Sequence, residues 1–200
     1  MIVTAQDIDS FEKLERVQFA TTLPGAKPIC LVGTIDSQGR TNAAPFSSVV
    51  HLGSNPPLLG MVTRPDTVER HTLSNILETK DYTLSHLNRS ILERGHQCSA
   101  RYDRDTSEFE ATGLTEAYFE NVKAPYVKES HIAIGLVLED IIDIPTNGTK
   151  LIVGGVKTVY LQDGLLGTGG DLDISQSIAS TALDTYFDLS NPTKLSYAKA

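Results

Sequence analysis

Cysteine and histidine, the residues that build disulfide frameworks and most zinc sites, are scarce and scattered in this chain. Its 200 residues include two cysteines, Cys30 and Cys98, which lie far apart and in no CxxC pattern. The five histidines form no HxH or HExxH pairing either. These spacings argue against a disulfide framework and against a dedicated metal site. Because Cys30 lies in an apolar run, we interpret it as a small buried residue and not as a nucleophile.

Positive charge and long hydrophobic runs are also lacking. The chain has 17 Lys and Arg residues against 25 Asp and Glu residues, which gives a formal net charge of −8. This balance disfavours a general nucleic-acid surface, because binding to a phosphate backbone depends on a basic field. No apolar run reaches membrane-spanning length, and the N-terminal residues do not resemble a signal peptide. We therefore expect a cytoplasmic protein that has neither a nucleic acid nor a membrane as its partner.

The common catalytic and nucleotide-binding motifs are missing as well. Neither GxSxG nor GxGxxG occurs, which argues against a hydrolase nucleophile turn and against a Rossmann domain. The glycine-rich residues 164–170 are not followed by Gly-Lys-Ser or Gly-Lys-Thr, so they do not form a Walker phosphate loop. Asp171 and Asp173 lack the spacing of an EF-hand and are interpreted as turn residues. The sequence therefore names no catalytic side chain.

The densest functional signal lies in residues 42–76, NAAPFSSVVHLGSNPPLLGMVTRPDTVERHTLSNI. Its small residues let backbone N–H groups approach a ligand closely, and its cationic cluster can hold a doubly charged anion. The hydroxyl groups nearby can donate to the same oxygens. The cluster consists of Arg64, Arg70, His71 and Thr72. We interpret the stretch as a site for a phosphate-bearing cofactor; a solvated turn with a helix cap is the alternative that the residues leave open.

A helix is expected to start inside this cluster. Residues 71–79 predict a short helix with Leu73, Ile76 and Leu77 on one face. The first N–H groups of a helix lack intrahelical partners and carry partial positive charge. Here they would lie beside the two arginines, an arrangement that suits a phosphate group.

The strand-like patterns predict a mainly β fold with flanking helices. Asn147-Gly148 between two apolar runs is a strong hairpin signal, and two long strands joined in this way suit a closed antiparallel barrel of six or seven strands. Pro45 cannot donate to a ladder, so it marks a sheet edge, a bulge or a loop opening. The expected strands are residues 27–36, 42–51, 58–62, 82–87, 114–119, 131–144 and 150–161.

Helical patterns occur near both ends and in the middle of the chain. Residues 1–23 predict one amphipathic helix with Asp9 and Glu12 as a possible capping box. Asn88 is expected to cap a helix over 89–98 that breaks near Gly95, and 175–187 predict a helix capped by Ser175. The charged residues 100–114 are interpreted as an irregular, solvated surface. We expect one domain over residues 1–200, with a helical segment (1–23), a barrel core (24–187) and a tail (188–200).

Six segments carry a resemblance to a known family through their joint order and spacing. They are PICLVGTIDSQGRTNAAPFSS (28–48), SNPPLLG (54–60), TRPDTVERHTLSNI (63–76), SEFEATGLT (107–115), KAPYVKES (123–130) and IVGGV (152–156). Over roughly residues 25–187 the chain resembles the FMN-binding split-barrel family of flavin reductases. The resemblance implies an FMN-binding split barrel, that is, a six- to seven-stranded antiparallel Greek-key barrel with FMN in a groove at its edge.

The same resemblance implies the site residues. The FMN phosphate would be held by Arg64, Arg70, His71 and Thr72. The flavin ring and the ribityl chain would contact Asn42, Ala43, Ala44, Pro45, Phe46, Ser47 and Ser48. Some family members have a lysine-aspartate pair where this chain has Arg70-His71, so the phosphate contacts can differ in detail. Part of the charged stretch after residue 100 would lie near the flavin or near a dimer contact.

An activity and an assembly are implied in the same way. NADH or NADPH would stack over the flavin and pass a hydride to its N5, and the electrons would go on to an acceptor that the sequence does not identify. A homodimer is expected. An FMN-containing electron carrier of the flavoredoxin type, without its own nicotinamide oxidation, fits the same residues, and a flavin-free scaffold is a third possibility.

Overall fold

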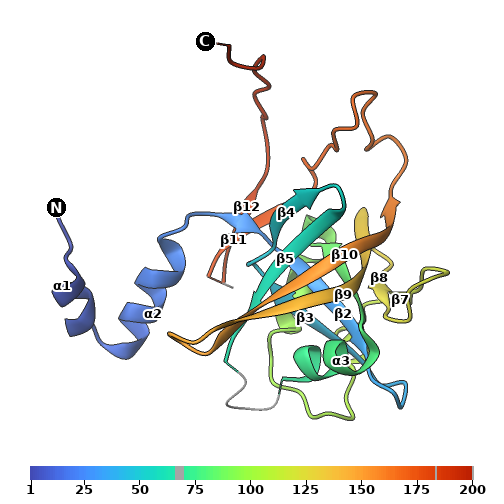
Figure 1. Ribbon diagram of the computed structural model, residues 1–200, viewed down its shortest axis with the longest axis horizontal. Coiled ribbons are helices and arrows are strands. Elements are labelled where there is room, and N and C mark those ends of the chain that lie inside the picture. The colour runs from blue at the N-terminus through green and yellow to red at the C-terminus, as the bar shows by residue number, and fades with distance from the viewer. Residues whose placement is uncertain (66–69, 183, 200) are drawn as a thin grey trace.

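The computed structural model describes residues 1–65, 70–182 and 184–199, and it shows a mainly β protein built on one seven-stranded antiparallel sheet (Figure 1). The strand order is β3-β2-β6-β9-β10-β5-β4. The bounds are β2 (Cys30–Ile35), β3 (Thr41–Phe46), β4 (Val50–Ser54), β5 (Pro57–Thr63), β6 (Asp81–His86), β9 (Ile132–Ile144) and β10 (Thr149–Leu161). The predicted strand number and antiparallel pairing are confirmed.

The barrel is open between its end strands, which corrects the expectation of a fully closed one. Within the described residues, β3 and β4 pair only with β2 and β5, respectively. Pro45 lies in β3 and has no N–H to donate outward, so the prediction that it marks a sheet edge is confirmed. The outward N–H of Ala43 donates instead to the carboxylate of Glu108, at 3.1 Å.

The long hairpin of β9 and β10 joins the two halves of the barrel. Thr149 pairs with Ile144 across the turn, which confirms the hairpin predicted at Asn147-Gly148. The part of β9 that is far from the turn (residues 133–137) pairs with β6. The part of β10 that is next to the turn (residues 150–155) pairs with β5. At Gly154 a Cβ atom would collide with the hydroxyl of Tyr82, so only glycine lets β10 pass this close to the barrel interior.

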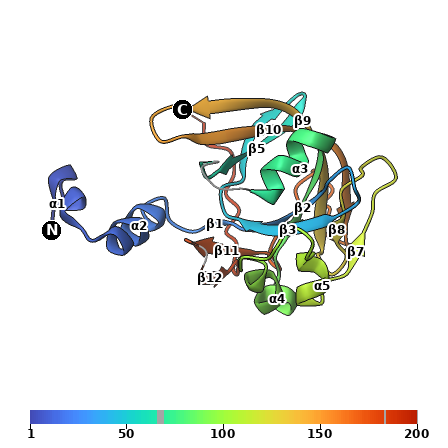
Figure 2. The same ribbon diagram turned by 90° about the horizontal axis from the view of Figure 1, so that it is seen from below.

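Strand β2 is buried on both faces, which explains its almost continuous apolar sequence. Ile29 and Leu31 join a core cluster with residues of α4 (Leu92–Gln97) and α5 (Glu108–Thr112) or adjacent to them. Cys30 and Val32 face the other cluster, which includes Leu73 and Ile76 of α3 (His71–Thr79). Figure 2 shows β2 and β3 between α3 and the pair α4 and α5.

The predicted helix over 71–79 is confirmed at both ends, and its apolar face needs one correction. Leu73 and Ile76 are buried, whereas the side chain of Leu77 is largely exposed. The loop expected before this helix includes residues 66–69, which lie outside the described residues.

The N-terminal segment forms two helices, and the prediction of one helix is wrong. They are α1 (Ala5–Ser10) and α2 (Lys13–Thr22). Phe11 is extended and ends α1, and Glu12 begins α2 by forming a capping box with Glu15 in place of the expected pairing with Asp9. Neither helix contains a buried residue, and the segment extends away from the barrel (Figure 1).

The predicted helix over residues 175–187 is also wrong. Within its described residues this segment forms β11 (Ile178–Thr181) and β12 (Thr185–Asp188), which pair with β1 (Lys27–Pro28) in the order β1-β11-β12. The hydroxyl of Ser177 bonds to ring nitrogens of His86 at 2.9 Å and of His131 at 3.0 Å. Strand pairing with β1 and these contacts with distant side chains fix the segment, and no local pattern could indicate either of them.

Smaller corrections concern the middle of the chain. The strand expected over 42–51 is divided into β3 and β4 by a bend at 47–49. Asn88 caps the helix as predicted, because its side chain accepts from the Ser90 N–H at 3.0 Å. The helix breaks after Ile91 and not near Gly95, so that it divides into the 3₁₀ helix η1 (Arg89–Ile91) and α4. The charged stretch contains α5, and residues 114–119 contribute only the short β7 (Glu116–Ala117), paired with β8 (Tyr126–Val127).

Two further features follow from the described part of the chain. No helix in it is both long enough and apolar enough to cross a membrane. It also contains no group of three or more His, Cys, Asp or Glu side chains placed to hold a metal ion. Both cysteines are free and buried, which confirms the expectation for Cys30. Burial raises the pKa of the Cys30 thiol to about 12.

Candidate functional site

A cavity of about 890 Å³ lies where the sheet is open. Its front wall is made by residues 42, 44–48, 62–64 and 70–73, which belong to β3, β5 and α3 or to the segments that adjoin them. Its loop wall is made by residues 98–104 together with Glu108. The remaining side is formed by Val17, Gln18, Thr21, Pro24, Lys27, Ala182 and Asp184.

All the residues predicted for the site except Ala43 line this cavity. The structure brings together Asn42, Ala44, Pro45, Phe46, Ser47, Ser48, Arg64, Arg70, His71 and Thr72. Ala43 is fully buried behind the front wall, within the apolar cluster that β2 shares with α4 and α5. That the lining residues bind FMN stays a prediction.

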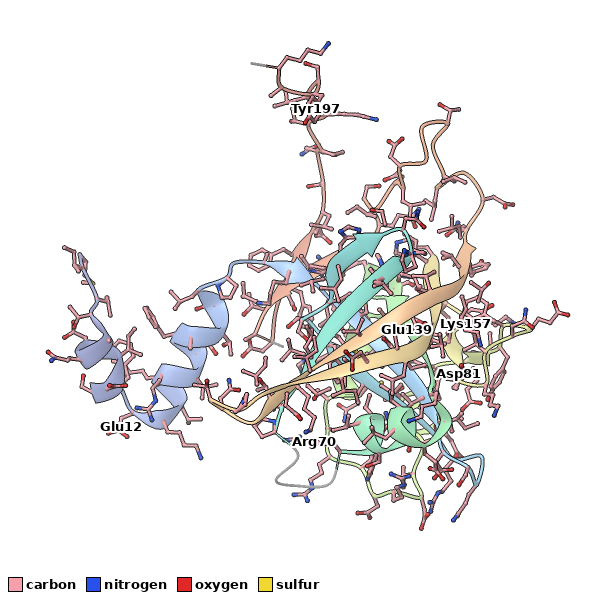
Figure 3. The ribbon with its side chains drawn as sticks, in the orientation of Figure 1. Glu12, Arg70, Asp81, Glu139, Lys157 and Tyr197 are labelled. Carbon is pink, nitrogen blue, oxygen red and sulfur yellow. The ribbon has the colours of Figure 1, made fainter. Side chains whose placement is uncertain are left out.

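One corner of the front wall presents polar atoms that lack partners. The Nε of Arg70 and the hydroxyl of Thr63 are buried, and neither makes a hydrogen bond within the described structure. Arg70 lies at the N-cap position of α3 and supplies no side-chain cap, so the first N–H groups of the helix are not satisfied by it. Figure 3 shows Arg70 at the start of this helix, below the end of β5. Buried unpaired donors beside a helix N-terminus fit a phosphate group.

A buried hydrogen bond ties this corner to the edge strand. The side-chain amide of Asn42 donates to the hydroxyl of Thr72 at 3.0 Å, and both residues are almost completely buried. The bond leaves the Thr72 hydroxyl hydrogen available to a ligand. It also fixes the distance between β3 and α3, which carry the two halves of the predicted site.

The two serines of the bend use their hydroxyls within the protein. Ser48 donates to the carbonyl of Val62 at 2.9 Å and accepts from its N–H at 3.0 Å, so it joins the bend to β5. Ser47 donates to the carbonyl of Ala182 at 3.2 Å and joins the bend to the end of β11. The bend therefore offers a ligand its backbone and the faces of Pro45 and Phe46 more than its hydroxyls.

The residue pattern alone predicts a solvated surface for residues 100–114 and names no residue of the loop wall; only the family resemblance placed part of this stretch near the site or near a dimer contact. Arg104 donates to Asp36 at 3.2 Å and to Asn75 of α3 at 3.0 Å. Arg40 bonds Asp36 at 2.7 Å and Asp105 at 2.8 Å. The loop is therefore held to the barrel at two neighbouring positions.

Asp36 is the centre of this arrangement. Burial alone would raise the pKa of its carboxyl group, but hydrogen bonds from the Arg40 and Gln38 backbone and the Arg40 guanidinium lower that pKa to about 2. Asp36 is therefore ionised at neutral pH and can hold both arginines.

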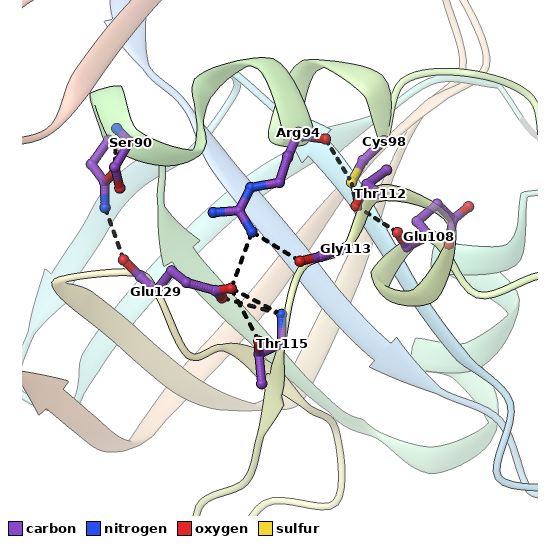
Figure 4. A network of polar contacts seen from close by, with 9 residues as sticks. Ser90, Arg94, Cys98, Glu108, Thr112, Gly113, Thr115 and Glu129 are labelled. Carbon is purple, nitrogen blue, oxygen red and sulfur yellow. Dashed lines mark hydrogen bonds and ion pairs between the residues drawn. The ribbon is translucent and has the colours of Figure 1, made fainter.

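A second polar network supports the loop wall from behind (Figure 4). Arg94 of α4 donates to the carbonyl of Gly113 at 2.8 Å and to the carboxylate of Glu129 at 3.3 Å. The Cys98 thiol contacts the carbonyl of Arg94 and the hydroxyl of Thr112. Burial is the main reason that the pKa of Cys98 rises to about 11, so this cavity residue is not a thiolate nucleophile at neutral pH.

Among the described residues, Glu108 is the one buried carboxylate of the cavity lining. Its side chain lies in α5 and accepts from the Ala43 N–H of the edge strand. Burial raises the pKa of this carboxyl group, and the hydrogen bond from Ala43 opposes that shift. The sequence signals that bear on this residue come from the resemblance, through the SEFEATGLT segment and the expectation that part of the charged stretch after residue 100 lies near the flavin or near a dimer contact.

The comparisons with known proteins agree with this architecture. The model of the flavin reductase like domain matches residues 25–173. A solved structure from Shewanella frigidimarina NCIMB 400, described as a flavin reductase with a split barrel domain, has a TM-score of 0.95 and 42% identity over 99% of this chain and 100% of that chain. Flavoredoxin of Desulfovibrio vulgaris (Miyazaki F) has a TM-score of 0.76 and 25% identity over 88% and 94% of the two chains.

A curated sequence from Halalkalibacterium halodurans, whose function is uncharacterised, is similar over nearly its whole length. It is 30% identical to this chain and covers 92% of it, while the match covers 95% of the relative. The family match and the solved structures confirm the split-barrel fold and the resemblance on which it was predicted.

Proposed function

The chain belongs to the flavin reductase-like family, and from this membership together with the cavity we propose that it binds FMN and reduces it with NADH or NADPH. The observation that carries the proposal is the corner where the buried Arg70 Nε, which has no hydrogen-bond partner within the described residues, lies at the start of α3, which has no side-chain cap there. An anionic group is what such a corner lacks. FMN ends in a dianionic phosphate, and a cavity of about 890 Å³ has room for the rest of the molecule.

In this proposal each part of the front wall has a distinct task. Arg64 and Arg70 neutralise the phosphate, while His71 and Thr72 donate to it from the first turn of α3. Asn42 keeps Thr72 in place through their mutual hydrogen bond. The flat surfaces of Pro45 and Phe46 and the backbone of the bend border the flavin ring. FMN itself would supply the hydride-accepting N5, so the protein needs to position the donor and to exclude water more than to provide an acid or a base.

An FMN-containing electron carrier is the second candidate. It is favoured by the similarity to flavoredoxin, which covers most of both chains. It uses the same cavity and differs only in how electrons reach the flavin.

We also propose that the protein forms a homodimer. The arm of α1 and α2 contains no buried residue, although Leu14 and Val17 expose much of their apolar surface. Helices this short are marginal without tertiary packing, so a second copy would stabilise them. Sedimentation velocity at several concentrations tests this point, and a strictly monomeric protein would contradict it.

The proposed activity is tested by visible spectroscopy. The purified protein is saturated with FMN, freed of excess flavin, and mixed under argon with NADH or with NADPH. Rapid bleaching of the bound flavin supports the reductase. Flavin that bleaches only after a separate reductase is added supports the electron carrier, and a protein that takes up no FMN contradicts both.

A further inference from the structure

The cavity contains more positive charge than one FMN phosphate requires. Among the described residues, five Lys and Arg side chains of this acidic chain line it, accompanied by three carboxylates. These cations are Lys27, Arg64, Arg70, Arg101 and Arg104. Arg64 and Arg70 lie at the corner proposed for the FMN phosphate. The remaining three lie on the other sides of the cavity.

Two of the remaining three cations have partners within the protein. Arg104 is paired with Asp36 and bonded to Asn75. Lys27 donates to the carbonyls of Thr21 and Gly25, both at 3.4 Å. Arg101 differs from both: it is exposed, and within the described part of the chain it has neither a hydrogen bond nor an ion pair.

Arg101 nevertheless lies on a loop that is held in place. After α4 the chain turns through bonds from Ser99 N–H to the His96 carbonyl and from Ala100 N–H to the Gln97 carbonyl. Three residues later Arg104 is bonded to Asp36. A cation presented by such a short, anchored loop loses less backbone freedom on binding than one on a free loop.

We propose that Arg101 forms a second anion subsite of the cavity, which binds a phosphate group of the nicotinamide dinucleotide and not the phosphate of FMN. This inference rests on the proposed function. A dinucleotide whose nicotinamide lies against the flavin has to place its phosphates at another part of the cavity surface, because α3 already faces the phosphate of FMN. The loop wall follows α4, which lies on the side of β2 and β3 opposite α3 (Figure 2), and it reaches α3 only at Asn75, one turn after the helix start. At Arg101 it offers a guanidinium that has no partner within the described residues and that those phosphates can bind.

The subsite can be tested by binding alone, without turnover. Protein saturated with FMN is titrated with oxidised NADP⁺ in a calorimeter, for the wild type and for Arg101→Ala, Arg101→Lys and Lys128→Ala. Lys128→Ala is the matched control: it also removes one positive charge, but Lys128 is exposed and does not line the cavity. We expect Arg101→Ala to weaken NADP⁺ about ten-fold or more, Arg101→Lys to recover part of that loss, and Lys128→Ala to have almost no effect.

Two further measurements distinguish Arg101 from its neighbours. The FMN affinity of Arg101→Ala should equal that of the wild type, and reduction by 1-benzyl-1,4-dihydronicotinamide, which has no phosphate, should be unchanged. Weaker FMN binding would assign Arg101 to the FMN phosphate and overturn the proposal. A changed molar mass of the variant in light scattering would assign Arg101 to an interface between copies, with the same consequence.

Failure of this inference is distinguishable from failure of the proposed function. A protein that takes up FMN but binds NADP⁺ equally well with and without Arg101, or not at all, contradicts the subsite alone. A protein that does not take up FMN contradicts the proposed function, and the subsite falls with it.

Discussion

The two walls of the cavity are positioned in different ways. In the front wall, local conformation places the main groups: Arg70 lies at a helix start, and Pro45 lies in an edge strand. In the loop wall, the main groups are placed by ion pairs between residues far apart in sequence; Arg104 and Asp36, for example, are separated by 68 residues. From this comparison we infer that the front wall supplies most of the binding energy for FMN, whereas the ion pairs of the loop wall keep that wall in place. Variants that separate affinity from stability can break or sharpen that distinction.

The largest effect is expected from Asp36→Ala, which removes the centre of the loop-wall ion pairs. The change leaves Arg40 and Arg104 without their shared carboxylate, so we expect a loss of about 3 kcal/mol in the free energy of unfolding. Urea denaturation at pH 7 measures it. Asp36→Asn is the matched control, because its amide oxygen can still accept from the backbone N–H groups of Gln38 and Arg40.

The same variant has an expected pH signature. The pKa of Asp36 is lowered in the folded protein, so its contribution to stability is present above the ordinary value of 3.8 and is lost as the pH falls toward about 2. The difference between wild type and Asp36→Ala should therefore shrink in acid. An equal difference at pH 7 and at pH 3 would show that the carboxylate charge does not hold the loop wall.

Arg70→Ala should have the opposite profile. We expect it to weaken FMN by about 1.5–3 kcal/mol, the range for a hydrogen bond to a charged group, with little change in unfolding free energy because Arg70 Nε has no partner to lose within the described residues. Fluorescence titration of FMN measures the affinity. Arg101→Ala is the control from the loop wall, and wild-type affinity in Arg70→Ala would remove Arg70 from the site.

Glu108→Gln tests whether the loop wall affects binding through charge. Glutamine can still accept from the Ala43 N–H, but it removes a negative charge from the cavity, so FMN should bind about two- to five-fold more tightly at pH 7. The pKa of Glu108 is raised in the folded state, so the wild type loses stability as the pH rises from 4.5 through that raised pKa. The variant should lack this loss. Weaker FMN binding would mean that the carboxylate accepts a hydrogen bond from the ligand.

The sequence predicted those parts of the fold that are determined by residues close together in the chain. The β9–β10 hairpin and α3 were predicted because Asn147-Gly148 and the apolar spacing after Arg70 each act within a few residues. Residues 175–187 have a helix-like spacing too, yet β11 pairs with the distant β1, and Ser177 just before it contacts His86 and His131. The buried contact between His131 and Ser177, which are 46 residues apart in sequence, overrides a weak local preference.

The candidate site divides in the same manner. The residues of the front wall could be predicted because small residues, a helix start and clustered cations occur within one stretch. Arg101 and Glu108 could not, because in the sequence they belong to a run of charges that is typical of a solvated surface. That run is brought to the cavity by contacts between residues far apart in sequence, namely the ion pairs of Arg40 and Arg104 and the bond from the Ala43 N–H to Glu108.

The smallest effect is expected from Ser47→Ala, and it asks whether the bend binds through side chains at all. The Ser47 hydroxyl already donates to the Ala182 carbonyl, so its loss should change FMN affinity by less than about 0.5 kcal/mol. Ser48→Ala is the matched control, since it breaks two bonds to Val62 and should reduce thermal stability more than Ser47→Ala does. If Ser47→Ala instead weakened FMN as much as Arg70→Ala, the hydroxyl would have to turn from Ala182 to the ligand. The front wall would then rearrange on binding, and the loop wall would be the more rigid of the two.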